Sequence, residues 1–128
     1  MWKGDALFVV PFWKAKINNF KVKKKSIEKV LRTYPEKPTQ LQTFAANRGS
    51  NFVEPFREIF QEELNGFATM IKNHCEITDV WSASYKTGDY HPYHSHGNKG
   101  LSGIIYLTLK DKMPHTVFVN ANPDWVTG

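Results

Sequence analysis

The stretch from Tyr85 to Leu109 reads YKTGDYHPYHSHGNKGLSGIIYLTL and holds three of the chain's five histidines. Its last part, Gly103–Leu109, has the branched and aromatic composition of a β-strand. Side chains alternate between the two faces of an extended strand, so His94 and His96 point the same way, about 7 Å apart at Cα. Two imidazoles placed in this way can converge on one metal ion, as part of a site with three protein ligands. The sequence therefore predicts His94 and His96 as metal ligands.

His91 is the third histidine of this stretch, and it has the opposite strand parity. Pro92 also separates it from the pair. We expect His91 to support the ligands from behind or to face a substrate. The alternative interpretation is that all three are surface or hydrogen-bonded histidines that hold no metal.

Outward from this stretch, the chain predicts one domain, residues 1–128, of the α+β class, with an N-terminal strand and helices packed on an antiparallel sheet. The N-terminal strand is Leu7–Ile17. One helix starts at a Ser26 cap and ends before Pro35. A longer helix, from about Phe52 to Asn73, carries a stripe of Phe and Met that we expect in the core. Between the helices lies a polar connection, Thr39–Gly49, and further strands are predicted at Ile77–Tyr85, 93–97, Gly103–Leu109 and Thr116–Val119, with a turn at Gly88.

A family resemblance adds to this interpretation. Tyr85-x-x-Gly88 followed by His94-x-His96 resembles the spacing around the His-x-Asp motif of prolyl-hydroxylase-like oxygenases. The following LSGIIYL, residues 101–107, resembles the "SGvyYL" strand of a group of Fe(II)- and 2-oxoglutarate-dependent oxygenases of phage and marine bacteria. The resemblance implies an incomplete double-stranded β-helix (jelly roll), Fe(II) and 2-oxoglutarate as cofactors, and dioxygenase activity of the hydroxylase type. It also implies that Tyr85 and Tyr106 bind the 2-oxoglutarate carboxylate by hydrogen bonds.

Two departures from the family pattern stand out. The acidic ligand of the family is replaced by His96. The distal histidine of the family, and the basic residue that follows it, have no counterpart before Gly128. We therefore expect a chain truncated at its C-terminus, either an oxygenase or an inactive fragment of one, with His115 as a substitute third ligand in a minor alternative.

Two other classes stay open. The opening of the cupin motif also matches this stretch, with Gly88 followed after five residues by His94-x-His96. Cupins have a Glu where this chain has Gly100 and Leu101. A cupin-like metal-binding protein is therefore one alternative. The other is a non-catalytic oligomeric module, since half a barrel exposes strand edges, through which a homodimer could form.

Composition and charge indicate which classes of binding partner and which cellular compartment to expect. The net charge is +5, and the densest basic run is Lys21, Lys23, Lys24 and Lys25. We interpret this run as a solvated turn leading into a helix, and the alternative is an anchor for nucleic acid or for an anionic substrate. No zinc-finger spacing or RNA-binding motif accompanies it, so no nucleic-acid partner is expected. No apolar run has membrane-spanning length. Cys75 is the only cysteine, which excludes an intrachain disulfide and predicts a cytoplasmic protein. The sequence does not identify the substrate, whether a small molecule or a protein.

Overall fold

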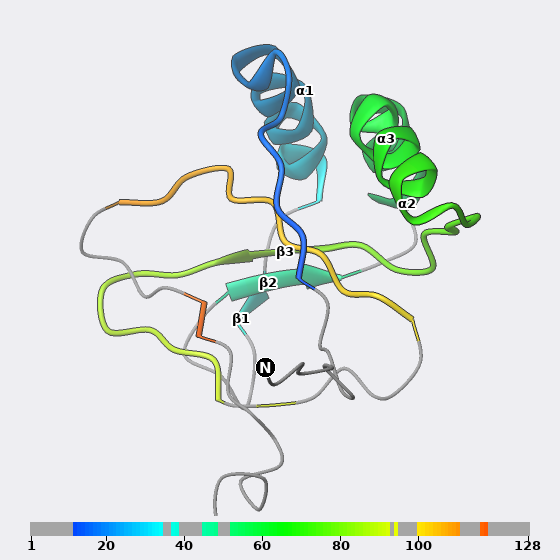
Figure 1. Ribbon diagram of the computed structural model, residues 1–128. Helices are drawn as coiled ribbons and strands as arrows, with labels where there is room; N and C mark the ends of the chain where they lie inside the picture. Colours follow the sequence, from blue (N-terminus) through cyan, green and yellow to red (C-terminus); the bar gives the residue numbers. More distant parts are fainter. Residues whose placement is uncertain are drawn as a thin grey trace, which may run out of the picture.

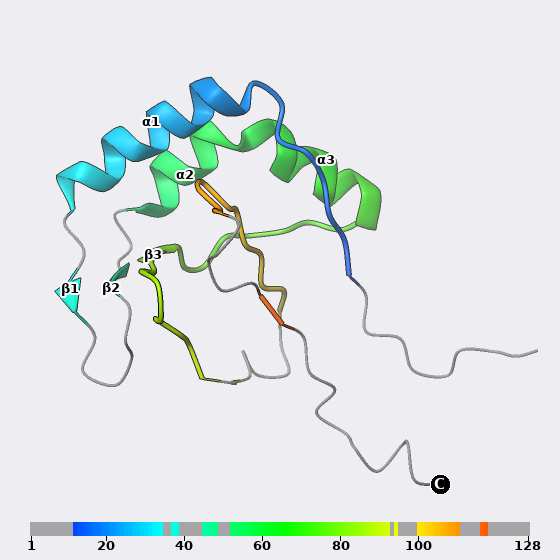
Figure 2. The same ribbon diagram turned by 90° about the vertical axis from the view of Figure 1, so that its left-hand side faces the viewer.

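The computed structural model describes residues 12–34, 37–38, 45–48, 52–92, 94, 100–110 and 116–117. The elements are α1 (Phe20–Thr33), β1 (Lys37–Pro38), β2 (Ala45–Arg48), α2 (Val53–Ile59), α3 (Gln61–Ile71) and β3 (Trp81–Ser84). The three helices lie on one side of the small sheet (Figures 1 and 2). No helix of this described part is both long enough and apolar enough to cross a bilayer.

The first helix begins six residues before the predicted cap. Asn19, with a left-handed backbone at φ 51°, precedes its first turn. Ser26 lies inside the helix, where its hydroxyl donates to the Val22 carbonyl oxygen at 3.2 Å, so its prediction as the cap is wrong. The lysine-rich run is helical and not a turn, because lysine is a good helix former and propagates a helix readily. The end of α1 at Thr33 agrees with the prediction.

The long helix predicted from Phe52 to Asn73 is present, but it is divided at Phe60. The backbone of Phe60, at φ −108° and ψ 19°, departs from helical values and separates α2 from α3. Backbone hydrogen bonds continue across the break, because Phe60 N donates to Phe56 O and Leu64 N donates to Phe60 O, each at 3.0 Å. The two short helices therefore continue one another with a bend between them.

The core is small and aromatic. Within the described residues, Ile27, Phe52 and Phe60 are the buried hydrophobic side chains. The ring of Tyr34 meets that of Phe52 edge-on, with centroids 5.1 Å apart, and so joins the end of α1 to the start of α2. The predicted core stripe is confirmed at Phe60 and wrong at Met70, which is 52% exposed.

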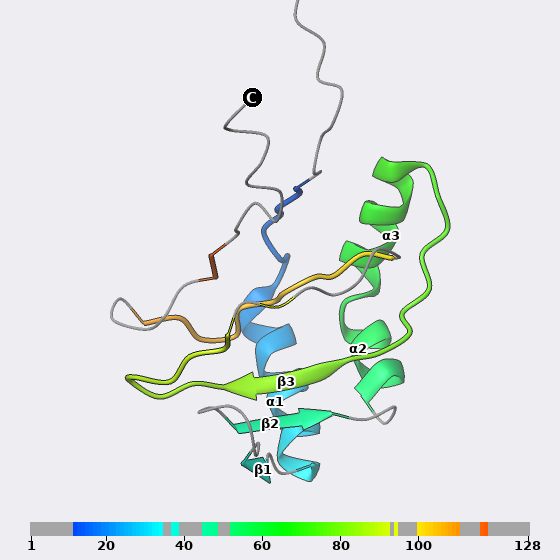
Figure 3. The ribbon, with the colours of Figure 1, turned by 90° about the horizontal axis from the view of Figure 1, so that it is seen from below.

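The sheet is antiparallel, with the strand order β1-β2-β3 (Figure 3). Lys37 pairs with Ala46, while Ala45 pairs with Ser84 and Arg48 with Trp81. The prediction of a strand within Ile77–Tyr85 is confirmed over β3, and the prediction of a polar connection is wrong over β2. The predicted pairing of a strand edge with a second copy of the chain stays a prediction.

The predicted α+β fold with an incomplete double-stranded β-helix is wrong. Helices make up most of the regular structure described, and the strands are only two to four residues long. The closest packing is of helix on helix and strand on strand, and not of helices on a broad sheet. Of the predicted strands, Gly103–Leu109 is irregular, and so are the described parts of the first and last ones, residues 12–17 and 116–117.

The physical reason is clearest at Gly103–Leu109. Strand propensity is a preference for a pleated, half-buried surface, and it has no effect where no ladder forms. Here Ile104 is 61% exposed and Leu109 48% exposed. Thr108 instead accepts a hydrogen bond from Lys24 Nζ at 2.9 Å, which holds the segment beside α1. The rest of the predicted strands, at 7–11, 93, 95–97 and 118–119, lies outside the described residues.

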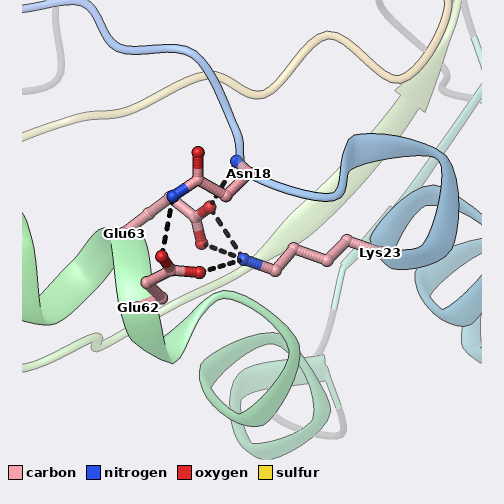
Figure 4. A network of polar contacts seen from close by, with 4 residues as sticks. All are labelled: Asn18, Lys23, Glu62 and Glu63. Carbon is pink, nitrogen blue, oxygen red and sulfur yellow. Dashed lines mark hydrogen bonds and ion pairs between the residues drawn. The ribbon is translucent and has the colours of Figure 1, made fainter.

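A polar network ties α1 to α3 (Figure 4). Lys23 Nζ donates to Glu63 Oε1 at 2.8 Å and to Glu62 Oε2 at 3.1 Å, and Asn18 Nδ2 donates to Glu62 Oε1 at 2.7 Å. Both carboxylates lie in the first turn of α3, where the helix dipole also favours negative charge.

The network shifts the pKa values of its members in the directions that an ion pair requires. The hydrogen bond to Glu63 raises the pKa of Lys23. Hydrogen bonds from Asn18 and Lys23 lower the pKa of Glu62. Partial burial by itself raises the pKa of Glu63, but the hydrogen bond and charge of Lys23, together with backbone hydrogen bonds from Glu63 and Asn18, outweigh it, and the net pKa is lowered. All three groups are therefore charged near neutral pH.

Candidate functional site

The histidine segment is introduced by a tight turn after β3. Asp89 N donates to Lys86 O at 3.0 Å, and the Asp89 carboxylate accepts from Lys86 N at 2.7 Å. Gly88 occupies the third position of this turn with φ 90°, a left-handed conformation that favours glycine. The predicted turn at Gly88 is confirmed. Beyond it, residues 89–92 run away from the helices (Figures 1 and 2).

His94 is exposed, and its ring is oriented by its own backbone. Nδ1 lies 2.9 Å from the carbonyl oxygen of Pro92. A carbonyl oxygen can only accept, so this hydrogen bond requires the proton on Nδ1. In the neutral ring the lone pair is then on Nε2, which is the nitrogen that a metal ion would bind. A ring N–H donated to a backbone carbonyl is also the usual arrangement around a metal-bound histidine.

His91 stacks on His94. The ring centroids are 4.0 Å apart, and the planes are inclined by 25°. The lone pair of an imidazole nitrogen lies in the plane of its ring, so two nearly parallel stacked rings do not aim at one ion about 2 Å from both. In this arrangement His91 acts as a stacking partner that restricts the His94 ring, and not as a second ligand to the same ion.

The described residues fit one metal ligand and not a complete metal site. His96, the predicted partner of His94, and His115, the substitute third ligand, both lie outside them. Over the part of the chain that the structure describes, no three His, Cys, Asp or Glu side chains gather closely enough to hold an ion. The assignment of His94 and His96 as ligands therefore stays a prediction.

The two tyrosines predicted to bind 2-oxoglutarate have different surroundings. Tyr85 follows β3 and is half-buried, and this burial raises the pKa of its hydroxyl above the ordinary value of 10.0. Tyr106 is 46% exposed, and its hydroxyl forms a hydrogen bond with Thr116 Oγ1. The contact to Thr116 joins two segments of the chain, which is a structural role. The role of both tyrosines in binding 2-oxoglutarate stays a prediction.

The exposed cations of α1 form a line along the helix that was not predicted from the sequence. Lys21, Lys25, Lys29 and Arg32 follow one another at spacings of four, four and three residues. That spacing is readable in the sequence. It was hidden because the helix was predicted to begin only at Ser26, after the first two of them.

Comparison with known proteins identified no relative of this chain. No protein-family model matches the chain, and no match to it was found among the curated proteins or the solved structures.

Proposed function

We propose that this chain binds a divalent transition-metal ion through His94 and His96, and that it is an Fe(II)- and 2-oxoglutarate-dependent oxygenase of the hydroxylase type or an inactive fragment of one. The observation that supports metal binding is the hydrogen bond from His94 Nδ1 to Pro92 O, which leaves the lone pair of the neutral ring on Nε2. The oxygenase class is supported by the sequence resemblance of residues 85–107. The fold described above adds no support to the oxygenase class.

The chemistry of the ligands sets which ions are worth testing. Imidazole nitrogen suits iron, zinc, copper and nickel, and it does not favour magnesium or calcium. Fe(II) is the ion that the oxygenase class requires, so Fe(II) is the first probe and Zn(II) the competitor.

The test is an anaerobic Fe(II) titration of the full chain, with and without 2-oxoglutarate. We expect His94→Ala and His96→Ala each to weaken Fe(II) binding at least about tenfold. Loss of a residue that only supports a metal ligand already weakens binding by about this much, so loss of a ligand should weaken it at least as strongly. His74→Ala is the matched control, because His74 is also exposed but lies before β3. Equal affinity in His94→Ala, His74→Ala and the unchanged protein would reject metal binding at this segment.

The same titration separates metal binding from oxygenase function. Fe(II) binding that is tightened by 2-oxoglutarate, followed in air by consumption of 2-oxoglutarate, is the result expected of an active oxygenase. Fe(II) binding tightened by 2-oxoglutarate without consumption is expected of an inactive fragment. Fe(II) binding that is indifferent to 2-oxoglutarate would retain the metal site and reject the oxygenase class.

His91 can be tested by keeping its ring and removing its nitrogen atoms. His91→Phe retains an aromatic ring for stacking on His94, whereas His91→Ala removes the ring. We expect Phe to preserve Fe(II) affinity and Ala to weaken it. A loss in His91→Phe as large as that in His94→Ala would show that His91 is itself a ligand.

We also propose a cytoplasmic location. It is supported by Cys75, the only cysteine of the chain, whose thiol is free and exposed. An exposed thiol is maintained in a reducing compartment and is readily oxidised elsewhere. Fractionation of cells that express the tagged chain tests the location directly.

A further inference from the structure

The outer face of α1 carries a line of positive charge. Lys21, Lys25, Lys29 and Arg32 are all exposed, and the 3.6-residue turn of an α-helix places them within an arc of about 80°. Ile27, the buried residue of α1, lies on the opposite side of the helix. In Figure 2, α1 runs along the upper edge of the molecule, with α2 and α3 below it. We call these four residues the basic stripe.

The basic stripe is not neutralised by the described part of the protein. Among the described residues, the ion pairs of α1 use two other lysines: Lys23 pairs with Glu62 and Glu63, and Lys24 with Glu28 at 3.7 Å. Within the residues described, no ion pair involves a member of the stripe. Glu28 is the only acidic residue of α1, and it lies beside Lys24. The α1 lysines are therefore divided between an internal network and an outward-facing line.

The shape of the stripe favours a linear polyanion over a membrane surface. It extends about 16 Å along the helix, at the 1.5 Å rise per residue, and is only one side chain wide. A helix that binds a membrane surface inserts an apolar face, but the apolar face of α1 is turned toward the core at Ile27. Among the exposed large hydrophobic side chains of the described residues, α1 itself contributes Val22, which is 65% exposed. A nucleic-acid strand, in contrast, presents phosphates in a line and attracts lysine and arginine whatever its sequence.

We infer that the basic stripe Lys21, Lys25, Lys29 and Arg32 binds the phosphate backbone of nucleic acid without reading its bases. This goes beyond the proposed metal function and does not depend on it. It replaces both the sequence-based interpretation of the lysine run as a solvated turn and the expectation of no nucleic-acid partner, because the helix aligns Lys21 and Lys25 with the two later cations.

The test is the salt dependence of binding to a fluorescein-labelled 20-base-pair duplex, measured by anisotropy with the full chain. Four neutralised phosphates predict a slope of about −3.6 in log K against log salt, so affinity falls about 150-fold between 25 and 100 mM salt. In the quadruple variant K21Q/K25Q/K29Q/R32Q we expect the slope to approach zero. In the charge-retaining variant K21R/K25R/K29R we expect it to be preserved.

The matched control removes the same charge from other parts of the surface. K14Q/K16Q/K86Q/K110Q also lowers the net charge by four, at exposed positions outside α1. We expect this control to keep the slope of the unchanged protein. Equal losses in both quadruple variants would overturn the inference, because net charge and not the stripe would then govern binding. Failure of the unchanged protein to bind duplex at 25 mM salt, or tighter binding to vesicles of anionic lipid than to duplex, would also overturn it. Circular dichroism of each variant verifies that α1 is retained.

Discussion

Replacing Phe60 by Ala should be among the most damaging single changes to the stability of this protein. The side chain is 1% exposed, and its ring lies 4.9 Å from that of Phe56. A buried Phe removes roughly 150–250 Å² from water. At about 25 cal/mol per Å², that burial is worth roughly 4–6 kcal/mol. Ala retains part of it, and Phe→Ala changes in protein cores cost about 3–5 kcal/mol. We expect a loss of about 4 kcal/mol from the free energy of unfolding.

The assay is urea unfolding followed by circular dichroism, with Met70→Ala as the control. Met70 lies on the same pair of helices but is 52% exposed, so its truncation should cost about 1 kcal/mol or less. With a denaturant slope of about 2 kcal/mol per molar urea, Phe60→Ala should lower the midpoint by about 2 M. A midpoint shift in Phe60→Ala no larger than in Met70→Ala would refute the placement of Phe60 in the core.

Two further predictions concern polar contacts. Because the pKa values of Glu62 and Glu63 are lowered, the stabilisation from their pairing is complete above their ordinary value of 4.5 and is lost as the pH falls through the lower folded-state values. The raised pKa of Lys23 has the opposite sign, with stabilisation present below 10.5 and lost as the pH rises through the folded-state value. Lys23→Gln should therefore weaken the pH dependence of the unfolding midpoint both below pH 4.5 and above pH 10.5. An unchanged pH profile would show that Lys23 does not stabilise the fold by pairing with Glu62 and Glu63. Tyr106→Phe and Thr116→Val should each lower the free energy of unfolding by about 0.5 kcal/mol. Because both changes remove the same hydrogen bond, the double mutant should lose less than the sum of the two single losses. Additive losses, measured by urea unfolding, would show that the two side chains do not share this hydrogen bond.

Sequence patterns were most informative where the signal was local and repeated. The apolar spacing from Phe56 to Ile71 predicted helix correctly, since packing on one face maintains a helix whatever the rest of the chain does. The bend at Phe60 has no such signature, because neither Gly nor Pro marks it. The start of α1 was misplaced for a related reason. Ser26 has the chemistry of a cap, but hydrophobic spacing does not reveal how far a lysine-rich helix continues toward its N-terminus.

The strands were predicted less well, because a strand depends on residues elsewhere in the chain. Gly103–Leu109 has strong strand composition and forms none, whereas Ala45–Arg48 has weak composition and becomes the central strand through its pairing with β3. The candidate site shows the same limit. Sequence parity set His91 apart from His94, but it could not show that the two rings stack or that the Pro92 carbonyl determines which nitrogen of His94 carries the proton.

The strand order β1-β2-β3 has a consequence for how the chain is made. During synthesis, residues 20–71 leave the ribosome before β3, and they contain the three described helices together with β1 and β2. β2 is then an edge strand, with one row of backbone N–H and C=O groups open to other chains until β3 emerges. A nascent chain is most prone to aggregate in such an interval. Only when residues 81–84 arrive does β2 become an interior strand of the described sheet, and the open edge on that side then passes from β2 to β3.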